Sequence, residues 1–145
     1  FAIHPGIGNV YGLIGNEANS LQADKRPLSS MAPTIVLRQN RPELVVGAAG
    51  GPRIISATLQ TILNVVDFHM PVGAAVEAPR VHHQWLPERL NVEAKIAVEE
   101  RKGLEQRGHV LREQSELGVV QAITWQGSTM SGTADSRKTE RARTE

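Results

Sequence analysis

Residues 45–55 read VVGAAGGPRII, a β-branched run that ends in small residues and then continues into an apolar segment. The run predicts a strand that turns directly into a helix, because Pro52 suits the first helical position, where its missing amide would have no partner. Gly50 and Gly51 let a ligand approach the main chain, and amides at a helix start carry partial positive charge. The turn therefore suits an anion or a developing oxyanion, or it serves only the close packing of helix on strand.

The surrounding sequence predicts a hairpin followed by a buried helix. Residues 34–39 (TIVLRQ) and 43–51 (ELVVGAAGG) indicate two strands, joined by a turn at residues 40–42. The helix is expected over residues 52–68, with apolar residues at three-and-four spacing on one face. That face is expected to be buried, and it consists of Ile55, Leu59, Ile62, Leu63 and Val66.

The remainder alternates shorter elements. Residues 1–19 contain too much glycine for a regular element and are predicted to form a loop. Further helices are expected over residues 72–78 and 97–108, the second stopping at Gly108. Strands are expected over residues 90–93, 109–113 and 119–125, and residues 79–90 are expected to be irregular.

Composition excludes several classes of function. The 145 residues suit one domain, and a net charge of +1 offers no broad field for nucleic acid. The chain has no cysteine, so it has no disulfide or thiolate site. Its five histidines lack metal-ligand spacing, which favours structural or surface roles over metal binding. The chain begins at Phe1 rather than Met, which indicates a processed or excised segment.

A second candidate site lies in residues 25–33, KRPLSSMAP, where two prolines restrain two adjacent serines. Ser29 and Ser30 either contact a ligand or satisfy their own backbone. A Ser-His-Asp triad built on either serine is disfavoured, since such residues can be chosen from almost any chain. Trp85 is interpreted as a hydrophobic plug rather than a stacking platform.

Four motifs in order resemble one family. They are GNVYGLIG (8–15), DKRPLSSMAPTIV (24–36), GAAGGPRII (47–55) and APRVHHQWLPERL (78–90). Together they resemble the small subunit of the γ-glutamyltranspeptidases, which are N-terminal-nucleophile hydrolases. The resemblance runs from Phe1 to about Leu90 and thins after about Glu93.

The resemblance implies an α+β fold that is part of a four-layer αββα sandwich. It implies acyl transfer from glutathione and related γ-glutamyl amides to water, amino acids or peptides. It makes Ser29 and Ser30 the hydroxyls that hold the donor α-carboxylate, and Gly50 and Gly51 the oxyanion-hole amides. Tyr11 matches the aromatic residue of a lid. No cofactor or metal is implied, and the location implied is periplasmic or secreted.

The resemblance also implies that residues are missing. The family's nucleophilic threonine and further glutamyl-binding groups precede the position of Phe1, and the large subunit is a separate part. The chain is therefore expected to be a C-terminal fragment, inactive alone and partnered by those missing parts. The alternative is a non-enzymatic module that binds a small anion or amino acid, or a structural fragment.

The expected organisation is a lid-like loop over residues 1–24, a body of sheet and helix over residues 25–136, and a charged, solvated tail over residues 137–145. The end of the sequence, ADSRKTERARTE, stands where the family continues through an Asp-Pro-Arg motif. This departure puts the final strand in question.

Overall fold

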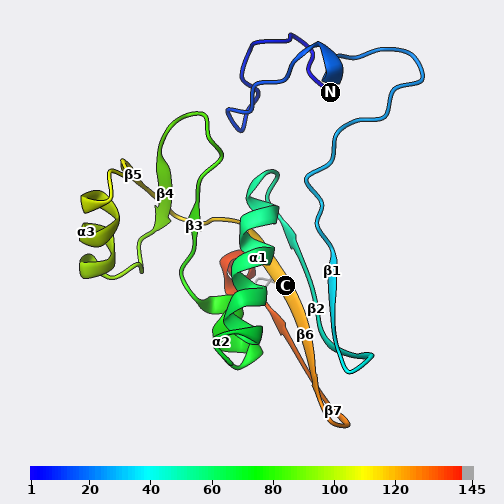
Figure 1. Cartoon of the computed structure of the whole chain (residues 1–145), viewed down its shortest axis with the longest axis vertical. Helices are drawn as coiled ribbons and strands as arrows, with labels where there is room; N and C mark the ends of the chain where they lie inside the picture. The colour runs from blue at the N-terminus through cyan, green and yellow to red at the C-terminus, as the bar shows by residue number, and fades with distance from the viewer. Residues whose placement is uncertain (142–145) are drawn as a thin grey trace.

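The structure, a computed structural model, describes residues 1–141 of the chain. It is a mixed α+β fold, as predicted (Figure 1). Its strands are β1 (Thr34–Arg38), β2 (Arg41–Ala49), β3 (Val81–His82), β4 (Leu90–Glu93), β5 (Leu111–Gln114), β6 (Val119–Gln126) and β7 (Thr129–Ala134). Its helices are α1 (Arg53–Val66), α2 (Val72–Glu77) and α3 (Val98–Gln106), with 3-10 turns η1 (Glu17–Asn19) and η2 (Ser136–Arg141).

The larger sheet has four antiparallel strands in the order β1-β2-β6-β7. Helices α1 and α2 cover one face of this sheet (Figure 1). Alternate residues of the two central strands point toward the helices, which is the period-two pattern of a half-buried sheet. The resulting core consists of Leu44, Val46, Val120 and Ala122 from the strands and Ala57, Val72 and Val76 from the helices.

The predicted hairpin is confirmed, with its turn at residues 39 and 40 rather than 40–42. Gln39 and Asn40 both have positive φ angles, 49° and 61°, so they form the tight turn. Two such residues give a loop whose twist matches that of the flanking strands. Pro42 lies within β2 beside an irregularity in the pairing of β1, which is where a strand tolerates proline.

Helix α1 is confirmed, but its predicted buried face is wrong in part, since Ile62 of that set packs against the core whereas other members are exposed. Ile55 and Leu59 are 56% and 53% exposed, whereas Ala57 and Thr61 are at most 1% exposed. Small side chains let the helix approach the sheet closely, and the Thr61 hydroxyl donates to the Ala57 carbonyl at 2.9 Å, which satisfies its buried oxygen. Ile55 and Leu59 consequently lie at the solvent, whereas Ile54 is buried and Ile62 packs against the core.

A smaller sheet, ordered β3-β4-β5, combines an antiparallel and a parallel pair. Strand β4 and helices α2 and α3 are confirmed, as is the helix stop at Gly108, which has a φ of +90°. Strands β3 and β7 were not predicted. Both are set by pairing with a neighbour, β3 with β4 and β7 with β6.

Residues 1–33 contain only the short turn η1 and isolated bridges, which confirms the predicted loop character of residues 1–19. Figure 1 shows this segment beyond the end of the larger sheet, joined to β1 by an extended strap. Within residues 1–141, no helix has the length and apolar character needed to cross a membrane.

Candidate functional site at the glycine turn

The turn between β2 and α1 depends on two glycines with positive φ angles. Gly50 has a φ of +134° and Gly51 a φ of +61°. Their carbonyls accept hydrogen bonds from the amides of Arg53, at 3.3 Å, and Ile54, at 3.1 Å, which closes the first helical turn. The amides of the turn therefore lie at the start of α1, where partial positive charge gathers.

Close packing also requires these glycines. A Cβ at Gly50 would lie 3.0 Å from the Cα of Gly118, which precedes β6. A Cβ at Gly51 would lie 2.8 Å from Cζ of the Tyr11 ring. Close packing and an anion site are thus compatible interpretations of the turn. The packing positions Gly118 and Tyr11 around the start of α1, whose amides remain suited to an anion.

Tyr11 is placed at the turn by a polar chain that starts on the smaller sheet. The side-chain amide of Gln84 donates to the Tyr11 carbonyl at 2.8 Å. The Gln84 Oε1 lies 2.9 Å from Nε2 of His82, and Nδ1 of that ring lies 2.8 Å from the hydroxyl of Ser56 in α1. Residues far apart in sequence thereby fix the loop around Tyr11.

Ser29 and Ser30 lie at the same end of the β1–β2 hairpin as the glycine turn. Thr34 pairs with Val46, so the strap entering β1 and the residues leaving β2 lie at the same end of the hairpin (Figure 1). Ser29 is exposed, and its hydroxyl accepts a hydrogen bond from the Met31 amide at 3.1 Å. Within residues 1–141, no hydrogen bond joins the serines to the glycine turn, and their role as a carboxylate site stays a prediction.

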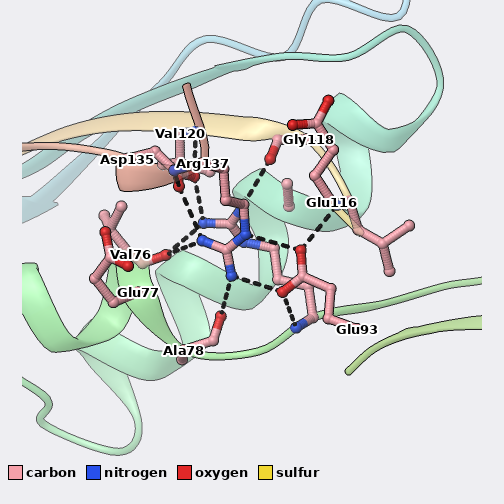
Figure 2. A network of polar contacts seen from close by, with 12 residues as sticks. Val76, Glu77, Ala78, Glu93, Glu116, Gly118, Val120, Asp135 and Arg137 are labelled. Atoms are coloured by element: carbon pink, nitrogen blue, oxygen red, sulfur yellow. Dashed lines mark hydrogen bonds and ion pairs between the residues drawn. The ribbon is translucent and has the colours of Figure 1, made fainter. Parts of the chain in front are cut away.

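Behind the turn lies a buried cluster of four charged residues that sequence reasoning missed (Figure 2). Arg80 pairs with Asp135 at 2.9 Å, and Arg137 pairs with Asp135 at 2.9 Å and with Glu93 at 2.6 Å. All four side chains are at most 11% exposed. Since each cation has at least one carboxylate partner, the cost of burying these charges is offset locally.

The cluster also holds the backbone that packs on Gly50. Arg80 donates to the Gly118 carbonyl at 2.9 Å, Glu93 accepts from the Leu117 amide at 2.8 Å, and Asp135 accepts from the Val120 amide at 2.8 Å. The segment at residues 117–120 is therefore fixed at several points.

These contacts set the charge state of Asp135. Burial acts to raise the pKa of Asp135, but hydrogen bonds from Val120 and Arg137 and the nearby Arg80 charge outweigh it, so the pKa lies below its ordinary value. Burial lowers the pKa of Arg80, against the attraction of Asp135. The cluster is thus organised around an ionised Asp135.

The charged tail expected from residue 137 onward is wrong at its first residue. Arg137 belongs to η2 and is held by two carboxylates, and β7 completes the larger sheet just before it. Asp135-Ser136-Arg137 keeps the first and third residues of the expected Asp-Pro-Arg motif, a signal that the sequence contained. Residues 142–145 of the predicted tail lie outside the described part of the chain.

The prediction that Trp85 is a hydrophobic plug is wrong, because the side chain is 76% exposed on the loop after β3. Its neighbours His82 and His83 do face different surroundings. His82 is 5% exposed, whereas His83 is exposed and its ring lies 6.5 Å from that of His109. His82 belongs to β3 and its ring contacts Ser56 and Gln84, whereas His83 lies in the loop that follows the strand.

Comparison with known proteins agrees with this architecture. The sequence matches the model of the γ-glutamyltranspeptidase family over residues 1–144. It is 45% identical over 123 residues to the glutathione hydrolase proenzyme of Escherichia coli, which covers 85% of this chain and 21% of that protein. It is 39% identical over 141 residues to the proenzyme of Pseudomonas aeruginosa, which covers 94% of this chain and 25% of that protein.

Solved structures agree with the sequence matches. The T380A mutant of Helicobacter pylori γ-glutamyltranspeptidase superposes with a TM-score of 0.90 at 45% identity, covering 95% of this chain and 77% of that one. The Pseudomonas nitroreducens enzyme complexed with L-DON gives a TM-score of 0.84 at 38% identity, covering 92% of this chain and 72% of that one.

The mixed α+β architecture around the glycine turn is that of an N-terminal-nucleophile hydrolase. The chain belongs to the γ-glutamyltranspeptidase family, and the two relatives given above are glutathione hydrolase proenzymes. It spans 21% to 25% of the length of the two curated relatives given above. The family match continues past Glu93, where the resemblance was expected to thin, to residue 144.

Proposed function

We propose that this chain supplies the oxyanion and donor-carboxylate sites of an enzyme that transfers the γ-glutamyl group of glutathione and related amides to water, amino acids or peptides. The observation that carries the proposal is the turn at Gly50 and Gly51. This turn lies at the start of α1, and the ring of Tyr11 packs against it. Amides in such a turn stabilise the charge that develops on the carbonyl oxygen, and losing one donor typically costs about 3 kcal/mol of barrier.

The second part of the proposed site is the serine pair. Ser29 and Ser30 would hold the donor carboxylate, which does not react, while the turn receives the reacting carbonyl. Their position at the same end of the hairpin supports this division, because one donor must reach both places. Tyr11 would then act as a lid over the bound donor.

We further propose that the chain acts as the C-terminal part of a small subunit and is inactive by itself. Thr34, Thr58 and Thr61 are internal, so none offers the free α-amino group that an N-terminal nucleophile uses as its base. Helices α1 and α2 cover one face of the larger sheet, and the other face is open. This open face is consistent with a further layer packed on it, as in an αββα sandwich. Export to the periplasm or the medium is proposed on the family resemblance alone, and cell fractionation tests it.

Hydrolysis of γ-glutamyl-p-nitroanilide tests the enzymatic proposal. We expect no turnover above a buffer blank for the isolated chain, and turnover once the missing parts of the enzyme are supplied. In that complete enzyme, Ser29→Ala combined with Ser30→Ala should raise the KM for the donor. An unchanged KM would remove the carboxylate assignment.

The alternative is a binding module without catalysis. Titration calorimetry of the isolated chain with glutamate separates the binding module from the enzymatic proposal. Binding of glutamate, together with no turnover when the missing parts of the enzyme are supplied, favours the module. Neither binding nor turnover would indicate a purely structural segment.

A further inference from the structure

A cavity of about 230 Å³ lies beside the glycine turn. Its floor is one face of the smaller sheet, where Asn91 of β4 pairs in register with Arg112 of β5. The loop at residues 10–12 and the first turn of α1 form its walls. Its lining comes from four stretches that are distant in sequence, so only the folded chain creates it.

The cavity is strongly cationic. Arg53, Arg89 and Arg112 line it together with neutral and polar residues, and none of its lining residues is a carboxylate. Within the described part of the chain, the ion pairs involve other arginines. Three guanidinium groups around one small space, without a counter-charge, favour an anion there.

One donor in this group is buried and unused. The Nε of Arg89 is inaccessible to solvent and has no hydrogen-bond partner. The Arg89 side chain is therefore not fully satisfied by the protein, and it lines the cavity. A guanidinium presents paired donors in a plane, the geometry that a carboxylate accepts in bidentate fashion.

The position of the cavity connects it to the glycine turn. Arg53 and Tyr11 both line it, and Tyr11 also contacts Gly51. A molecule whose carbonyl lies at the turn would therefore extend past Tyr11 toward the arginines. The volume is below the roughly 300–1,000 Å³ of pockets for drug-sized ligands, which suits the end of a short peptide.

We propose that this arginine pocket binds the C-terminal carboxylate of the peptide part of a γ-glutamyl peptide. The incoming acceptor peptide would use the same pocket, because the leaving and attacking amines occupy the same side of the acyl group. This inference rests on the proposed function, and it adds a site for the end of the substrate opposite the glutamyl carboxylate.

The test compares two donors in the complete enzyme, glutathione and its analogue in which the glycine carboxylate is an amide. The unmodified enzyme should favour glutathione in kcat/KM by about tenfold or more, since a hydrogen bond to a charged group is worth at least one decade. Arg89→Gln and Arg112→Gln should each bring this ratio toward one, mainly through the KM for glutathione.

Arg41→Gln is the matched control, because Arg41 is an exposed arginine at the start of β2, outside the pocket lining. It should keep the ratio of the unmodified enzyme. If Arg89→Gln fails to fold, Arg112→Gln carries the test, because Arg112 is exposed.

A ratio near one in the unmodified enzyme would overturn the inference, as would a preference that both pocket variants retain. The latter result is expected if a carboxylate from another part of the enzyme fills the pocket. Absence of turnover with either donor would defeat the proposed function itself, and this inference with it.

Discussion

Gly51 satisfies two independent requirements at one position. Its φ of +61° is a conformation that side chains other than glycine adopt at a cost, and the Tyr11 ring occupies the space of a Cβ. Asp135 is similarly constrained, since it accepts from a backbone amide and pairs with two arginines. Gly51 packs against Tyr11, and Asp135 contacts Arg80 and Val120, so each position connects segments that are distant in sequence.

Gly51→Ala should therefore destabilise the chain by about 1–2 kcal/mol, through backbone strain and displacement of the Tyr11 ring. Urea unfolding measures the change. Gly47→Ala in β2 is the control, because a Cβ there meets nothing within 4 Å. Equal effects of the two substitutions would show that the packing of Tyr11 on the turn contributes nothing.

The ionised state of Asp135 predicts an acid limit to stability. Because its pKa is lowered on folding, its contribution is complete above the unfolded pKa, near 3.9, and is lost as the pH falls through the folded value. The urea midpoint should thus decline below about pH 4.

Asp135→Asn should flatten that decline and lower stability at neutral pH by about 3–5 kcal/mol, because it leaves Arg80 buried without its carboxylate. Asp67→Asn, at the exposed end of α1, should do neither. If the urea midpoint of Asp135→Asn fell with pH as steeply as that of the unmodified chain, the acid sensitivity would not come from Asp135.

At the scale of elements, α1 shows where sequence periodicity succeeds and fails. Its existence and its start after Pro52 follow from local chemistry, since proline and glycine restrict the backbone directly. Its orientation does not, because the helix carries apolar residues on more than one side. The buried side carries the small residues Ala57, Thr58 and Thr61 together with Ile54.

Adjacent isoleucines test this orientation. Ile54 is 7% exposed and Ile55 is 56% exposed, so Ile54→Ala should cost about 2–4 kcal/mol and Ile55→Ala within about 0.5 kcal/mol in the isolated chain. Thermal or urea unfolding gives both values with one matched pair. The reverse order would restore the face predicted from the spacing.

At the scale of the whole molecule, the larger sheet has helices on one face and an apolar surface on the other. Ile35 and Met130 are 63% and 62% exposed, and Ile123 is 36% exposed. Strands β1 and β7 form the two edges of this sheet. A surface of this kind marks an interaction site, and unpaired edges add to it.

The isolated chain should therefore self-associate, with a sedimentation mass above that of one chain that rises with concentration. Ile35→Lys together with Met130→Lys should reduce this association by placing charges on the open face. Leu28→Lys, on the strap before β1, is the control for adding charge to an exposed apolar position. A monomer at all concentrations would argue against a covered sheet face.

The sequence by itself determined the family, the hairpin, the helix start and the residues at the glycine turn, because glycine, proline and β-branching act on the backbone within a few residues. It also contained Asp135 and Arg137, but nothing local distinguished them from a solvated tail. Only the tertiary structure decided their burial, the buried face of α1 and the arginine pocket. Each of these depends on segments that meet across the fold, where packing and desolvation, rather than spacing along the chain, set the outcome.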